Sequence, residues 1–216
     1  MKVYIIIIFF LIFFSGIGQI ERSPTILVLN SQKTIVDKKY DSIAKLMVRK
    51  GLTEEHKKRI RESNAEFPLI SEKEILFLEE VDISTQIPYG VYYILSYKFF
   101  EYYQNLLIFP AKENNDSSLE QLNIISEKYD TNWVVNIPLT EFYFENGVNK
   151  GIVKYQLYNK KSKEILIEKE LNINDHNFGG EMACLEGTIS CVIMNSIWTI
   201  SLEVYNFMLK NKMYWR

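Results

Sequence analysis

Apolar and polar residues alternate with two different periods along this chain, and the change of period separates strands from helices. Residues 25–30 form a short apolar run with β-branched side chains, which predicts a first strand. In the segments that follow, apolar residues recur at helical spacing, with glycine, threonine and serine marking the boundaries. We therefore expect helices over residues 37–51, from Thr53 onward, and over residues 71–80.

The stretch from residue 91 to residue 105 is the most aromatic part of the chain. The preceding residues 88–90, Pro-Tyr-Gly, predict a turn. The apolar residues after this turn recur every three or four positions, which predicts a helix with a buried stripe. That stripe consists of Val91, Leu95, Phe99 and Tyr102.

The second half of the chain has the clearest strand signals. Residues 106–110 predict a short strand, and residues 118–129 predict a helix. Asn146–Gly147 and the polar residues 160–163 then read as turns between apolar runs. These runs predict a three-stranded meander over residues 133–144, 152–158 and 164–171.

A long apolar periodicity closes the chain and completes the predicted fold. Residues from Leu185 to Met208 repeat at helical spacing, which predicts one helix over residues 181–210 with both of these side chains on its buried side. Helices between the early strands favour a mixed sheet. The fold class is therefore α/β (α+β): a single mixed sheet with a C-terminal antiparallel meander, helices packed mainly on one face, and a long C-terminal helix.

The N-terminal segment, residues 1–18, has the pattern of an export signal. Lys2 precedes an unbroken apolar run over residues 3–14, and small residues lie just before Gln19. The run is shorter than the roughly 20 apolar residues that a membrane-spanning helix needs, although a retained anchor stays the alternative. We expect cleavage between Gly18 and Gln19, a single domain over residues 19–216, and a periplasmic or secreted protein. Because no cysteine stands immediately after the cleavage point, we expect no lipid anchor.

The net charge of the chain argues against nucleic acid and anionic lipid as partners. The chain has 25 basic and 27 acidic side chains, for a net charge of −2. This balance creates no long-range field that would attract nucleic acid or anionic lipid. We expect a protein or another envelope component as partner and no cofactor, and the oligomeric state stays open.

The two cysteines, Cys184 and Cys191, are candidates for one disulfide in an exported chain. On a continuous helix their α-carbons would lie roughly 10 Å apart, beyond the roughly 7 Å limit for a bridge. They pair only if Gly187 and Thr188 break the helix. We favour two buried free thiols and keep the disulfide as the alternative.

Candidate catalytic chemistry concentrates in the loop from Asp175 to Glu181. His176 follows Asp175 there, and Ser190 is the nearest serine that a hydrolase triad could use. No Gly-x-Ser-x-Gly elbow surrounds any serine, so a small hydrolase is the weaker interpretation. A zinc site built from Cys184, Cys191 and His176 is disfavoured by the seven-residue cysteine spacing, so we expect no metal.

A resemblance to known proteins covers about a third of the chain, from Asn105 to Glu170. It has a strand, a polar loop, a helix ending in Tyr129 and Asp130, and three meander strands. This order resembles the small α/β domain of bacterial envelope proteins: the curli-secretion lipoproteins, the amino-terminal domain of TolB, and penicillin-binding-protein activator lipoproteins. The residues that carry the resemblance are Tyr129, Asp130, Trp133, Val134, Tyr155, Leu157, Lys163 and Ile165. The resemblance implies an assembly or scaffolding role without catalysis, and it transfers no functional residue.

The aromatic helix offers the remaining functional candidate. Most of its rings are expected in the core, but one buried stripe cannot hold all of them. The candidates for a binding surface are Tyr92, Tyr93, Tyr97 and Tyr103. We therefore expect a non-enzymatic envelope protein that binds or assembles through protein or envelope-component contacts. The alternatives are a hydrolase that uses the 175–181 loop and a glycan-binding module that uses exposed tyrosines.

Overall fold

The computed structural model describes residues 25–40, 49–50, 55, 58, 80–81, 83–100, 106–177 and 184–212. Strands and helices alternate in its first half, and a run of strands precedes the last helix. In chain order the elements are β1 (Ile26–Val36), the 3-10 turn η1 (Lys38–Tyr40), β2 (Arg49–Lys50), β3 (Glu80–Val81), α5 (Ile83–Phe100), β4 (Ile108–Ala111), α6 (Leu119–Lys128), β5 (Trp133–Glu145), β6 (Val148–Asn159), β7 (Glu164–Asn174) and α7 (Ile189–Lys210).

The main sheet has the strand order β4-β1-β5-β6-β7. Strand β1 runs parallel to both β4 and β5, whereas β5, β6 and β7 are antiparallel. Parallel neighbours need crossover connections, and α5 and α6 belong to those connections, while hairpins suffice for the antiparallel strands. Asn146 and Gly147 both have positive φ, at 52° and 85°, as a tight hairpin turn requires. The predicted mixed sheet with its meander is confirmed.

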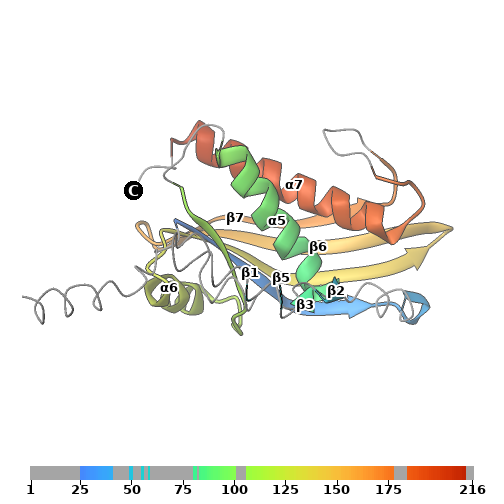
Figure 1. Ribbon diagram of the computed structural model, residues 1–216, viewed down its shortest axis with the longest axis horizontal. Coiled ribbons are helices and arrows are strands. Elements are labelled where there is room, and N and C mark those ends of the chain that lie inside the picture. Colours follow the sequence, from blue (N-terminus) through green and yellow to red (C-terminus); the bar gives the residue numbers. More distant parts are fainter. Residues whose placement is uncertain are drawn as a thin grey trace, which may run out of the picture.

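Two layers of helix sandwich the sheet unequally (Figure 1). Helices α5 and α7 lie along one face, over a large core that includes Val28, Val135 and Leu157. Helix α6 lies against the other face, where Leu27 and Leu122 belong to a smaller cluster. The prediction that helices pack mainly on one face, with a long last helix, is confirmed. Within the described ranges, no helix is long and apolar enough to cross a membrane.

The first third of the chain contains more strand than the sequence pattern predicts. Strand β1 continues to Val36, beyond the strand predicted over residues 25–30. The helix predicted over residues 37–51 is wrong at its C-terminal end, where Arg49–Lys50 pair with β3, and at its start Lys38–Tyr40 form only the 3-10 turn η1. Glu80 also lies in a strand, at the end of the helix predicted over residues 71–80. The reason for the longer β1 is non-local: its last residues pair in register with β5. Residues 41–48 and 71–79 lie outside the described ranges.

Gly90 marks the closest approach of the two large helices. The turn predicted over residues 88–90 is wrong, because Pro88 and Gly90 both lie inside α5. A Cβ atom on Gly90 would lie 2.2 Å from Cδ1 of Ile197 in α7. The glycine is therefore required by packing between helices, and this packing overrides the local turn preference.

A second glycine lets α7 approach the sheet. Gly151 lies in β6, and a Cβ atom there would lie 2.8 Å from Cγ1 of Val192 in α7. On the same strand, the buried Tyr155 hydroxyl donates to the Glu203 carboxylate of α7. Burial is the main cause that raises the pKa of Tyr155, and the Glu203 carboxylate raises it further. The tyrosine is therefore a neutral donor that ties the middle of α7 to the sheet.

The replacement Gly90→Ala tests this packing. In an exposed helix the change would stabilise by up to about 1 kcal/mol, but here the new methyl group overlaps a buried, β-branched side chain. We expect a net loss of about 1–2 kcal/mol in the free energy of unfolding, measured by urea denaturation. The control Ser96→Ala, on the same helix, should stay within about 0.5 kcal/mol of the wild type. A Gly90→Ala variant more stable than the wild type would contradict the proposed role of the glycine.

Candidate functional site

The loop after β7 contains a buried polar network centred on Asp175. The Asp175 side chain is only 2% exposed. Its Oδ2 accepts hydrogen bonds from the backbone N and the side-chain Nδ2 of Asn149, at 2.8 and 2.5 Å. Asn149 Nδ2 also donates to the carbonyl of Gly187 at 2.9 Å, and the Gly187 N–H donates to the carbonyl of Asp175 at 3.1 Å. The network thus joins the start of β6, the end of β7 and the segment before α7.

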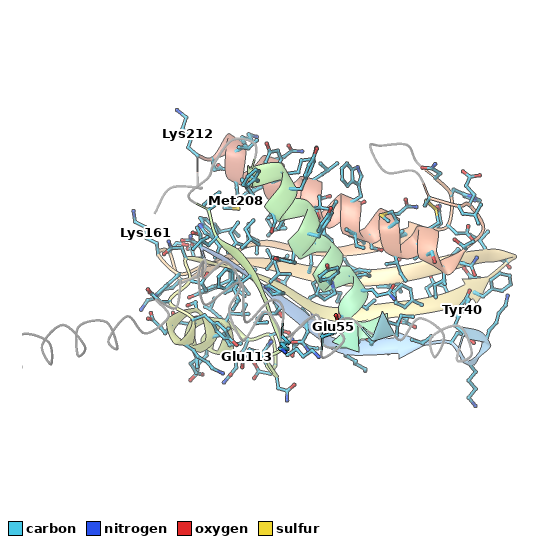
Figure 2. The ribbon with its side chains drawn as sticks, viewed as in Figure 1. Tyr40, Glu55, Glu113, Lys161, Met208 and Lys212 are labelled. Carbon is cyan, nitrogen blue, oxygen red and sulfur yellow. A yellow bond between two sulfur atoms is a disulfide. The ribbon has the colours of Figure 1, made fainter. Side chains whose placement is uncertain are left out.

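Tyr40 connects this network to the beginning of the chain. The buried hydroxyl donates to Oδ1 of Asn149. Burial raises the pKa of Tyr40, and the nearby carboxylates of Asp37 and Asp175 raise it further. The hydroxyl therefore stays protonated and keeps its role as a donor. Figure 2 shows Tyr40 toward the end of the molecule that lies opposite α6.

A disulfide between Cys184 and Cys191 holds the segment before α7 to the first turn of that helix. Their α-carbons lie 4.9 Å apart, so the favoured interpretation of two free thiols is wrong. The geometric argument assumed a helix over residues 181–210, whereas α7 begins at Ile189. Gly187 has a φ of 75° and Thr188 caps the helix by accepting from the Cys191 N–H. The condition for pairing, a helix break at these two residues, is met.

The late start of α7 changes the position of Leu185. This residue was expected on the buried side of the helix, but it lies in the loop before it and is 77% exposed. Met208, at the other end of the same predicted stripe, is buried as expected. Inside α7, the Nδ2 of Asn195 donates to the carbonyls of Asn174 and His176 at 3.1 and 2.8 Å. The Asn195 side chain of α7 thus holds the loop backbone in place after the strand has ended.

This geometry is not that of a catalytic triad. The Nδ1 of His176 lies 3.8 Å from Oδ1 of Asp175, too far for a hydrogen bond, and its side chain is 63% exposed. Ser190 is exposed in the first turn of α7, and within the described ranges no serine hydroxyl is bonded to His176. Glu181 lies outside those ranges. The sulfur atoms of Cys184 and Cys191 are committed to the disulfide, so they do not form a zinc site with His176.

A second candidate site lies on the outer side of helix α5. The side chains of Tyr93, Tyr97 and Phe100 are 57%, 52% and 72% exposed. They are separated by four and three positions, so they form one continuous row along the helix. We call this row the α5 aromatic stripe. Val91 and Leu95 lie on the buried side of α5, as predicted.

The other predicted tyrosines do not join the stripe. Tyr92 is half-buried, and its ring lies 6.0 Å from that of Tyr89. Tyr103 lies outside the described ranges. Phe100 was not singled out as a binding residue from the sequence, yet it is the most exposed of the three. Its position three residues after Tyr97 is the signal that would have placed it in the row.

The stripe is almost free of formal charge. Within α5 the single charged side chain is Lys98, whose ammonium group lies 5.3 Å from the centre of the Trp198 ring. The stripe therefore presents aromatic carbon and phenol hydroxyls to its surroundings. Three aromatic side chains at these exposures offer on the order of 300–400 Å² of surface. That is about the size of the largest apolar patch on an ordinary monomer, and such patches are often functional.

Comparisons with known proteins give weak structural likenesses, two of which are described below. No protein-family model matches the sequence, and no curated protein matches it. The chain is similar to a neuraminyllactose-binding hemagglutinin homolog from Helicobacter pylori, with 12% identity, a TM-score of 0.33, and coverage of 89% of this chain and 87% of that one. It is also similar to the LpoB C-terminal domain from Escherichia coli, with 10% identity, a TM-score of 0.25, and coverage of 73% and 87%. At these scores we draw no functional argument from either likeness.

Reduction of the disulfide tests its structural role before α7. Opening a loop of this length lowers the free energy of unfolding by about 2 kcal/mol, because the unfolded chain loses its constraint. We expect dithiothreitol to produce this loss in urea denaturation of the wild type. The Cys184→Ser/Cys191→Ser variant should start from the lower stability and show no further response. A fully reduced wild type of unchanged stability would contradict the interpretation.

Proposed function

We propose that this chain is an exported, non-enzymatic protein of the bacterial envelope that binds a protein partner through the α5 aromatic stripe. The observation that carries the proposal is the exposure of Tyr93, Tyr97 and Phe100 on a helix that buries its opposite side. Exposed tyrosine and phenylalanine rings in one row are the composition that interface hot spots favour.

The size of the stripe supports a partner interface with a small energetic centre. A stable protein interface buries about 800 Å² on each side, roughly twice the area that the stripe offers. The three rings therefore supply the centre of such an interface, and surrounding residues supply its rim. Because the stripe carries no carboxylate and Lys98 lies beside Trp198, the partner surface is apolar or aromatic rather than strongly charged.

Export is supported by two independent features. Residues 1–18 have the pattern of a signal sequence. The disulfide between Cys184 and Cys191 is consistent with an oxidising compartment such as the periplasm or the extracellular medium. The proposed mature protein is a single domain over residues 19–216.

Glycan binding is the second candidate, and one observation favours it. Tyr93 and Tyr97 are neighbours on the surface of α5, and both are more than half exposed. Exposed rings of this kind also stack on sugars. In a glycan-binding module the same residues would be needed, so the identity of the ligand distinguishes the two functions.

Substitution of the stripe tests the proposed function. The triple variant Tyr93→Ser/Tyr97→Ser/Phe100→Ser removes the rings but leaves the buried side of α5 unchanged. We expect its retention by an envelope preparation from the source bacterium to fall at least tenfold, since each lost hot spot costs about 2 kcal/mol. The unfolding free energy, followed by urea denaturation, should change by less than about 1 kcal/mol.

A matched control exists on the other face of the sheet. Leu119 and Ile124 on α6 are exposed apolar residues, at 47% and 49%. The variant Leu119→Ser/Ile124→Ser should be retained like the wild type. Equal retention of the stripe variant and the wild type would overturn the proposal. Loss of retention on addition of soluble envelope glycans would assign the stripe to sugar binding instead.

Intact-mass spectrometry of the protein recovered from its native host tests the export step. We expect a mature chain that starts at Gln19 and is two hydrogen masses lighter than the reduced form, because the cysteines are joined. A protein that retains Met1 and sediments with membranes would instead support the anchor alternative. The role of the stripe is tested by the retention experiment and does not depend on this result.

A further inference from the structure

Strand β7 forms a long edge of the sheet. Among the strands that the structure describes, it pairs with β6 on one side and has no neighbour on the other. It spans Glu164–Asn174, and Glu168, Lys169 and Glu170 are successive exposed residues near its middle. An edge of this length presents a row of backbone N–H and C=O groups that another extended chain is able to pair with.

The two faces of this edge differ in chemistry. On the α7 side, Leu171 and Ile173 pack against the core but are only half-buried. On the opposite side, Glu168 and Glu170 project from the same stretch and are exposed. Strand residues alternate between faces, so an added strand would meet apolar side chains on one side and carboxylates on the other.

The carboxylates are only partly engaged by the neighbouring strand. The Nε2 of Gln156 donates to Oε1 of Glu168 at 2.9 Å, and the Nζ of Lys154 lies 3.0 Å from Oε2 of Glu170. Within the described residues, the second oxygen of each carboxylate has no such contact. Each carboxylate therefore keeps an oxygen that is able to accept from a cationic side chain on an added strand.

Lys169 does not compensate this charge. Its ammonium group lies on the α7 side of the sheet, 2.7 Å from Oε2 of Glu203. Among the described residues, Lys154 is the basic side chain paired with these two carboxylates, so the face that carries Glu168 and Glu170 keeps a net negative charge at the edge. This asymmetry excludes an added strand with acidic residues on that face and favours one with lysine or arginine.

A second copy of β7 is a poor occupant. Directly opposed residues of an antiparallel pair share a face, so pairing centred on Lys169 brings Glu168 against Glu170 of the other copy. A register centred on Leu171 opposes these glutamates to asparagines, yet it supplies no basic side chain to either carboxylate. Self-pairing thus adds no basic side chain to the acidic face in either register.

We infer that the outer edge of β7, residues 167–174, is a docking site for an extended segment of another protein that adds antiparallel to the sheet. The segment carries apolar residues opposite Leu171 and Ile173 and lysine or arginine opposite Glu168 and Glu170. Backbone hydrogen bonds supply the affinity, and the alternation of apolar and basic residues supplies the specificity. The site is separate from the α5 aromatic stripe, because α5 packs over β1 and β4, near the opposite edge of the sheet from β7.

A synthetic peptide of about seven residues tests this inference. Isoleucines are placed to face Leu171 and Ile173, and lysines are placed to face Glu168 and Glu170. With the full mature protein, we expect saturable binding by isothermal titration calorimetry. Amide hydrogen exchange should slow in residues 167–174, with no change in the other edge strand, β4. Two control peptides should each bind at least tenfold more weakly: one with glutamates in place of the lysines, and one with N-methyl groups on alternate backbone amides.

Charge reversal of the protein provides the matched test. The variant Glu168→Lys/Glu170→Lys should lose at least tenfold in affinity for the lysine peptide and should prefer the glutamate peptide. The control Glu120→Lys, an exposed acidic position on α6, should bind like the wild type. Absence of binding by the lysine peptide, equal binding by the N-methylated peptide, or exchange protection outside residues 167–174 would overturn the inference. Dimerisation of the wild type with the same protection pattern would also overturn it, in favour of a second copy as occupant.

Discussion

The close packing of helix α7 against both α5 and the sheet determines which sides of these helices are buried and which are exposed. Gly90 in α5 and Gly151 in β6 each lack the Cβ atom that would collide with an α7 side chain. Further along the helices, the rings of Phe99 and Tyr205 meet edge to face, 4.9 Å apart. These contacts fix the rotation of α5 about its own axis. Because that rotation buries Val91 and Leu95, it leaves Tyr93, Tyr97 and Phe100 on the outside.

The same constraint explains why the residues with catalytic potential have a structural role. The disulfide and the Asn149–Asp175 hydrogen bonds fix the position at which helix α7 begins. A buried carboxylate is costly unless it is hydrogen-bonded, and Asn149 satisfies it with two donors. His176 is left at the surface, beside Asp175 but not aligned with it. The loop therefore stabilises the position of a helix, whereas the surfaces proposed for binding lie on α5 and on the edge of β7.

The parts of the fold that could be predicted from the sequence are those with local determinants. Asn146–Gly147 specifies its hairpin, and Ser118 caps α6 by accepting from the Gln121 N–H, so the meander and this helix were placed closely. The errors come from interactions between distant segments. Pro88 and Gly90 read as a turn because nothing local reveals Ile197, more than a hundred positions away. The disulfide was judged on a helix that in fact starts after Cys184, and the β1 extension depends on its partner β5. Exposed tyrosines were expected, and the spacing of Phe100 from Tyr97 was a usable local signal, but which side of the helix faces outward depends on the orientation of α5.

Site-specific photo-crosslinking in the native host is the most direct test of whether the α5 aromatic stripe is the contact surface. A photoreactive phenylalanine analogue replaces Tyr93, Tyr97 or Phe100 in turn, and Ile124 on α6 serves as the reference position. If the stripe is the contact surface, all three stripe positions crosslink to the same protein and position 124 does not. Crosslinks to that protein from position 124 alone, or no crosslink from any stripe position, would contradict it.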